Sequence, residues 1–111
     1  PYEDRPDNYR GHKHKQILRI LSLYPDLAFV LIGDSGEKDV DIYRAVAEEY
    51  PGRIKAIYIR DVRSRQRAER VQKVLDSIPY IPCLLVKSYA EATEHAVANG
   101  LLSLDTYNDF R

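Results

Sequence analysis

The apolar positions of this chain follow two different periods, which together predict four helices separated by three strands. Between Lys13 and Tyr24, apolar side chains recur at intervals of three and four residues, the spacing of one helix face, and Pro25 ends the pattern. The other three helices are expected over Asp39–Tyr50, after Ser64 and after Ser88.

The last helix carries a signal at each end. Ser88 and Glu91 have the spacing of a capping box, in which the serine hydroxyl accepts a backbone N–H near the start of the helix. Asn99 and Gly100 are residues that tolerate the left-handed conformation in which many helices end. We therefore expect this helix to begin just after Ser88 and to end at Asn99.

Three short apolar runs lie between the helices, and they read as strands. The runs are Ala28–Ile32, Ile54–Ile59 and Cys83–Val86. The first is continuously apolar, which is typical of a strand in a parallel sheet covered on both faces. The alternation of helices and strands predicts an α/β fold, a three-layer Rossmann-like arrangement with a short parallel sheet flanked by helices. Sheets usually have about four to six strands, so we expect part of a larger domain.

Composition excludes several classes of protein. The 111 residues suffice for one domain, and 17 basic residues balance 17 acidic ones, so net charge gives no argument for nucleic-acid binding. A single cysteine, Cys83, cannot form an internal disulfide and fits a reducing compartment. No apolar run approaches the ~20 residues that span a bilayer, and no signal-peptide pattern opens the sequence. We therefore expect a cytoplasmic protein.

The most informative stretch is the acidic turn after the first strand. The run Phe29–Ile32 ends in Gly33-Asp34-Ser35-Gly36, and Asp39 opens the next helix. Ligands of open α/β sheets bind at the carboxyl ends of the strands, and two carboxylates there suit Mg²⁺. The alternative is an ordinary strand-to-helix turn in which one aspartate caps the helix. Sequence chemistry alone leaves these two interpretations level.

Two neighbouring motifs have similarly open interpretations. Ser35, Arg60 and Asp61 could line a pocket at the same edge, although Arg60 and Asp61 could equally form a structural ion pair. Six basic residues surround the third helix, and we interpret them as a solvated face, with contact to an anionic lipid surface as the alternative. They are Arg60, Arg63, Arg65, Arg67, Arg70 and Lys73.

Three histidines, His12, His14 and His95, are expected to be solvated.

Several of these motifs together resemble a known family. Lys13, the run Phe29–Asp39, the sequence Ile57-Tyr-Ile-Arg-Asp61 and the segment Glu91–Leu101 are similar to the actin-patch-associated phosphatidate phosphatase catalytic domain. That family belongs to the haloacid dehalogenase-like hydrolases. The resemblance extends from about His12 to Leu102.

The resemblance implies a Mg²⁺-dependent phosphatase that works through an aspartyl-phosphate. It implies that Asp34 is a direct or water-mediated Mg²⁺ ligand and that Asp39 is a second acidic residue supporting the metal. It further implies that Lys13 binds the phosphate. The expected partner is a phosphate ester, with phosphatidate at a membrane surface as the candidate, and the expected location is cytoplasmic and peripheral to the membrane.

One family motif is missing. Members carry their nucleophile in an Asp-x-Asp-x-Thr/Val sequence on an earlier strand, and no such sequence occurs here. The chain also begins at Pro1 rather than Met. We therefore expect residues 12–102 to be the C-terminal half of the catalytic domain, with 1–11 a linker or loop and 103–111 a tail. Such a half should have no turnover alone and could form homo-oligomers through its uncovered sheet edge. The alternative is a non-catalytic α/β binding or oligomerisation module.

Overall fold

The computed structural model describes residues 11–36, 38–61 and 65–102, and in them the predicted succession of elements is confirmed. Its elements in chain order are α1 (His12–Leu23), β1 (Phe29–Asp34), α2 (Asp39–Glu49), β2 (Ile54–Arg60), α3 (Arg65–Asp76), β3 (Cys83–Val86) and α4 (Tyr89–Ala98). The predicted tail, nearly all of the predicted N-terminal linker and the expected cap Ser64 lie outside the described residues.

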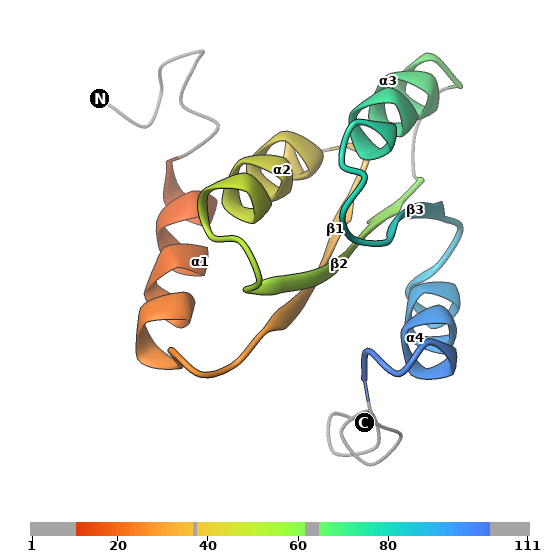
Figure 1. Cartoon of the computed structure of the whole chain (residues 1–111). Helices are drawn as coiled ribbons and strands as arrows, with labels where there is room; N and C mark the ends of the chain where they lie inside the picture. Colours follow the sequence, from red (N-terminus) through yellow and green to blue (C-terminus); the bar gives the residue numbers. More distant parts are fainter. Residues whose placement is uncertain (1–10, 37, 62–64, 103–111) are drawn as a thin grey trace.

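The strands form a parallel sheet in the order β1-β2-β3 (Figure 1). At their carboxyl ends, Asp34 of β1 lies opposite Arg60 of β2, and Arg60 lies opposite Val86 of β3. β1 is longer than predicted because the pairing with β2 continues past its apolar residues, through Gly33 and Asp34. The acidic turn therefore begins inside the sheet, and this fixes the backbone of Asp34.

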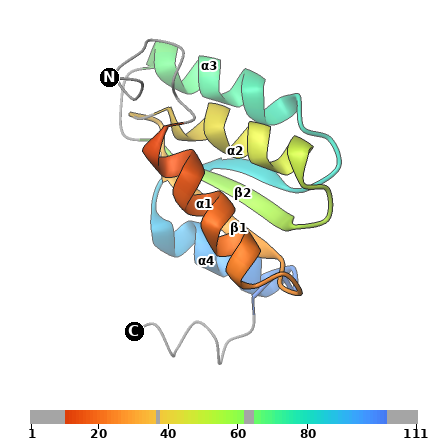
Figure 2. The same ribbon diagram turned by 90° about the vertical axis from the view of Figure 1, so that its left-hand side faces the viewer.

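Helices cover both faces of the sheet, so the fold has three layers (Figures 1 and 2). Alternate residues of β2 point to opposite faces. Ile57 and Ile59 join the larger core with α1, α2 and α3, whereas Ala56 and Tyr58 join a smaller core with α4. This is the predicted α/β arrangement of a short parallel sheet between helices.

Two histidines are less exposed than we expected. His95 is partly buried on α4, where its Nδ1 lies 2.6 Å from the hydroxyl of the fully buried Tyr58. His14 is buried on the inner side of α1, with its Nε2 3.4 Å from a carboxylate oxygen of Glu49. Both expectations were wrong because each ring lies against a residue of an element that only the tertiary fold brings near, Tyr58 of β2 for His95 and Glu49 of α2 for His14.

Both ends of α4 have the features that the sequence predicts. Ser88 Oγ accepts the Glu91 N–H at 3.1 Å, and the Glu91 carboxylate accepts the Lys87 N–H at 2.8 Å, so the predicted cap is confirmed. Gly100 follows α4 at φ +72°, the predicted left-handed position.

Within the described residues, every helix is too short or too polar to cross a membrane.

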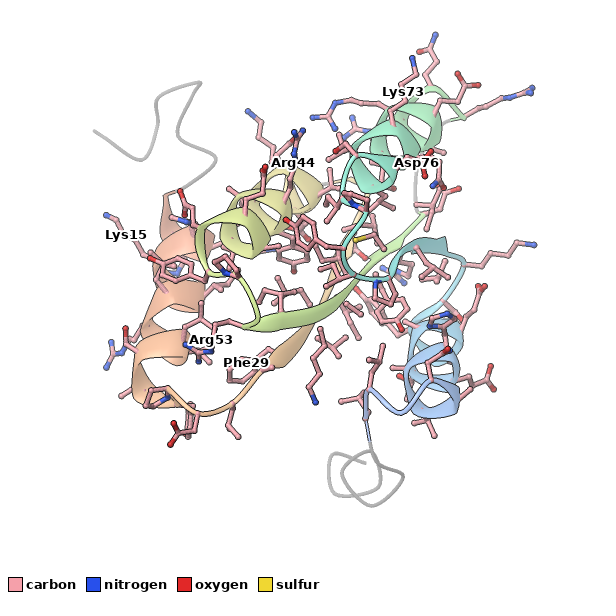
Figure 3. The ribbon with its side chains drawn as sticks, in the orientation of Figure 1. Lys15, Phe29, Arg44, Arg53, Lys73 and Asp76 are labelled. Atoms are coloured by element: carbon pink, nitrogen blue, oxygen red, sulfur yellow. The ribbon has the colours of Figure 1, made fainter. Side chains whose placement is uncertain are left out.

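Arg53 closes the carboxyl end of α1. Its guanidinium donates to the carbonyl oxygens of Leu21 and Tyr24 at 3.0 and 2.7 Å, and to that of Leu27 at 2.8 Å. Figure 3 shows this side chain between α1 and the start of β2. Terminal helix carbonyls have no partner within their helix, so Arg53 satisfies them and joins α1 to the sheet.

Candidate functional site

The carboxyl edge of the sheet brings together the acidic turn, the start of α1 and the end of β2. Asp34 is the last residue of β1 and Arg60 the last of β2, and they lie opposite each other in the register. Arg60 Nε donates to Asp34 Oδ1 at 3.0 Å, and its Nη2 lies 3.4 Å from Oδ2. Arg60 therefore forms an ion pair with Asp34, and its predicted place in a pocket at this edge stays a prediction.

Tyr89, the first residue of α4, completes this arrangement. Its hydroxyl donates to Asp34 Oδ1 at 2.8 Å, and the Arg60 guanidinium lies over its ring, 4.5 Å from the centroid. The hydrogen bonds from Arg60 and then Tyr89 lower the pKa of Asp34 below its ordinary value. Asp34 is therefore ionised at neutral pH.

Asp39 joins three elements at the same edge. Its Oδ1 accepts from Lys13 Nζ at 2.5 Å, and its Oδ2 accepts the backbone N–H of Asp34 at 3.0 Å. The Asp39 side chain is 5% exposed, whereas that of Lys13 is 44% exposed. Lys13 thus reaches from the first turn of α1 to a buried carboxylate and remains accessible to solvent.

Gly33 makes the position of Asp39 possible. A Cβ at Gly33 would lie 2.4 Å from Asp39 Oδ2 and 2.8 Å from its Cβ and Cγ. Such distances are far below van der Waals contact. The bare backbone of Gly33 therefore lets the carboxylate fold back over the end of β1.

The helix-capping alternative for the two aspartates is not supported. The N-cap position of α2 is Lys38, which makes no side-chain cap hydrogen bond. Both carboxylate oxygens of Asp39 instead contact α1 and β1. The turn serves to gather charged groups from several elements.

The other two residues of the predicted pocket make backbone hydrogen bonds to the neighbouring strands. Ser35 is buried, and its N–H donates to the Arg60 carbonyl at 2.9 Å. Asp61 is exposed, and its N–H donates to the Val86 carbonyl at 2.8 Å. Both residues therefore continue the strand pairing beyond the carboxyl ends of β1 and β2. The Ser35 side chain is enclosed rather than open to solvent.

The basic residues of α3 are exposed, as predicted for a solvated face. Arg70 pairs with Asp41 at 2.7 Å, and Arg65 pairs with Glu69 at 3.5 Å. Lys73 projects from the outer surface of α3 (Figure 3). Arg67 differs, because its guanidinium lies 3.3 Å from the carbonyl oxygens of Ser35 and Gly36. It thus ties α3 to the acidic turn.

The donors at this edge fit part of a magnesium site. Mg²⁺ is commonly held by one or two carboxylates, with water and phosphate oxygens completing six positions. Asp34 is ionised and its side chain is 28% exposed, so it is the carboxylate best placed to bind a cation directly. The buried Asp39 is better placed to support it through Lys13 and the Asp34 backbone. No group of three or more ligating side chains gathers among the described residues.

Tyr89 is the functional candidate that sequence reasoning missed. Its signal was its place in the chain, because the first residue of a helix after a parallel strand lies at the carboxyl edge of the sheet. Asp34, Asp39 and Arg60 gather at this edge, as their positions in the sequence suggested, and Lys13 joins them through its contact with Asp39.

Comparison with known proteins points to one family. The model of the family described as "Phosphatidate phosphatase APP1, catalytic domain" matches residues 4–61. Phosphatidate phosphatase APP1 of Saccharomyces cerevisiae is 46% identical over 50 residues, which are 45% of this chain and 8% of the yeast protein. An uncharacterized protein of Schizosaccharomyces pombe is 44% identical over 54 residues, 49% of this chain and 9% of that protein. This chain thus matches less than a tenth of either relative, and no solved structure matches it significantly.

Proposed function

Because this chain belongs to the family of the phosphatidate phosphatase APP1 catalytic domain, we propose that it forms the metal- and phosphate-binding edge of a Mg²⁺-dependent phosphatase. The observation that carries the proposal is the fold-back of Asp39 over Gly33, which joins Lys13 to the backbone of Asp34. A capping turn requires no such link to α1.

Each side chain has a distinct role in this proposal. Asp34 binds Mg²⁺, and Asp39 holds Lys13 beside it. Lys13 offers its exposed ammonium group to a phosphoryl oxygen, because a positive charge there offsets the negative charge of the transferring group. Bound Mg²⁺ would supply Lewis-acid polarisation of that phosphoryl group.

The proposed substrate is a phosphate ester, and phosphatidate is the first to test. We also propose that the protein works in the cytoplasm at a membrane surface, where it would meet such a lipid. The proposed mechanism is that of haloacid dehalogenase-like hydrolases, in which an aspartate forms a phosphoryl-enzyme.

These 111 residues carry no Asp-x-Asp-x-Thr/Val sequence. We therefore predict no phosphate release above background from the chain by itself, and Mg²⁺-dependent turnover by the purified chain would refute this.

A chimera tests the function itself. The matched stretch of this chain replaces its counterpart in the Saccharomyces cerevisiae phosphatidate phosphatase, and phosphate release from phosphatidate vesicles is measured with and without Mg²⁺. We expect Mg²⁺-dependent release that Asp34→Asn abolishes and that Asp41→Asn leaves intact. A chimera with native circular dichroism but no activity, or with activity insensitive to Asp34→Asn, would refute the proposal.

An oligomerisation module is the second candidate, because apolar side chains are exposed near the end of α1. Leu23, Tyr24 and Leu27 are each more than half exposed, and Ile20 is 44% exposed. Such clusters often mark contact surfaces. Sedimentation equilibrium separates the candidates: an oligomer that Leu23→Ser dissociates supports self-association, whereas a monomer at all concentrations excludes it.

A further inference from the structure

Arg60 and Tyr89 close a ring of side chains around Asp34 that the proposed metal and phosphate roles leave unexplained. Asp34 accepts hydrogen bonds from both, and the Arg60 guanidinium lies over the Tyr89 ring. Each of the three side chains therefore touches the other two, although they come from β1, β2 and α4. Three elements converge here on one carboxylate.

The ring is built so that its side chains can separate while the backbone stays in place. Strand pairing holds Asp34 opposite Arg60, and the Asp61 N–H bonded to Val86 continues the ladder. The side chains are accessible, since that of Arg60 is 36% exposed and Tyr89 is 45% exposed. Rotation about side-chain bonds is therefore enough to part Arg60 from Asp34.

The Arg60 guanidinium and a divalent cation would compete for the same Asp34 carboxylate oxygens. Arg60 occupies them now, and they are also the most exposed carboxylate oxygens of the proposed metal pair. A divalent cation on Asp34 repels a guanidinium held beside it. A released guanidinium is a planar fork of donors that matches two phosphate oxygens. The aromatic face of Tyr89 supports the guanidinium near the site.

We propose that Arg60 is a switchable phosphate-binding residue, held by Asp34 and Tyr89 until a divalent cation takes Asp34. The inference rests on the proposed function. Arg60 then moves from the carboxylate to the phosphate, so that cation and phosphate binding are coupled through a side chain of this chain. Tyr89 is a positioning residue that keeps Asp34 and Arg60 together.

Calorimetric titration of the full 111-residue chain tests this coupling. MgCl₂ is titrated first, and inorganic phosphate is then titrated at saturating Mg²⁺. Arg60→Gln should bind Mg²⁺ about fivefold more tightly, because its competitor on Asp34 is gone. The same variant should bind phosphate about tenfold more weakly, because a charged two-point donor is lost. A merely structural Arg60 would weaken both.

Two further variants sharpen the test. Tyr89→Phe keeps the ring and removes the hydroxyl, so Mg²⁺ binding tightens about twofold while phosphate binding is unchanged. Arg70→Gln breaks another arginine–aspartate pair, the one with Asp41, and should change neither affinity. Should Arg60→Gln fail to fold, the Arg60 Nε–H resonance of the wild-type chain replaces it. That signal should shift on Mg²⁺ addition and shift again with phosphate.

The possible results distinguish a failure of this inference from a failure of the proposed function. Opposite changes in the two affinities of Arg60→Gln support the switch, as does the two-step shift of the Arg60 resonance. Mg²⁺ binding that is unchanged or weaker in Arg60→Gln, or an Arg60 resonance that Mg²⁺ does not move, overturns the switch and leaves the metal site standing. A wild-type chain that binds no Mg²⁺ overturns both.

Discussion

Replacing Gly33 with alanine tests the fold-back of Asp39 on which the site depends. The new methyl group would lie 2.4 Å from Asp39 Oδ2 and 2.8 Å from its Cβ and Cγ, so Asp39 must retreat by roughly 1 Å. Overpacking of this kind costs about 1–3 kcal/mol. The displaced carboxylate also loses the backbone hydrogen bond from Asp34, and bonds to charged groups contribute about 1.5–3 kcal/mol. We expect Gly33→Ala to lower the free energy of unfolding by about 3 kcal/mol.

Urea denaturation followed by circular dichroism gives the free energy of unfolding for each variant. Gly52→Ala is the matched control, since its methyl group meets no atom within 4 Å but sits at φ +84°. Backbone strain there should cost about 1–2 kcal/mol. A larger loss at Gly33, whose φ is not positive, identifies steric conflict as the cause.

A double-mutant cycle with Asp39→Gly assigns the conflict to one side chain. Once Asp39 has no side chain, Gly33→Ala should cost less than about 1 kcal/mol, because nothing remains for the methyl group to displace. The reasoning is refuted if Gly33→Ala costs as much in the Asp39→Gly background as in the wild type.

Three further predictions test other parts of the structure. Arg53→Met should lower the free energy of unfolding by about 1–2 kcal/mol because three carbonyl oxygens lose their donor. The control Arg44→Met breaks only an exposed ion pair and should change the free energy of unfolding by less than about 0.5 kcal/mol. Equal losses in the two variants would contradict the role of Arg53. Because the pKa of Asp34 is lower in the folded protein than its ordinary value of 3.8, the ionised carboxylate stabilises the fold at pH values above 3.8. This contribution to stability disappears as the pH falls through the pKa of Asp34 in the folded protein. Denaturation between pH 6 and pH 3 should thus show a steeper loss of stability for wild type than for Asp34→Asn, and parallel curves would argue against the ion pair. Burial raises the pKa of the Cys83 thiol to about 11, so iodoacetamide should label native protein at pH 8 roughly a hundredfold more slowly than unfolded protein, whereas similar rates would place Cys83 at the surface.

The order of the elements was predictable because each has a local signal. Apolar spacing marks the helices, continuous apolar runs mark the strands, and Ser88 and Gly100 mark the ends of α4. The expected end of β1 at Ile32 was too early. Pairing with β2 decides where that strand ends, and the neighbouring strand lies outside the local window.

The site was predictable in its location and less so in its contacts. Parallel strands put Asp34 and Arg60 at one edge, but their register decides that they face each other. Tyr89 was missed because its signal was its position at the start of the helix after β3, and nothing in the neighbouring sequence marks it as a partner of Asp34. His14 was misjudged for a related reason, since the partner surface that buries it belongs to a distant helix.

Titration of Mg²⁺ into the isotope-labelled chain tests the central claim most directly. The backbone N–H signals of Gly33, Asp34 and Ser35 are followed by NMR in the wild type, in Asp34→Asn and in Asp41→Asn. Asp41 is a suitable control because its side chain is also 28% exposed and also pairs with an arginine. We predict saturable shifts in the wild type and in Asp41→Asn that disappear in Asp34→Asn. Signals that stay still in the wild type, or that move equally in all three proteins, would contradict a metal site at this turn.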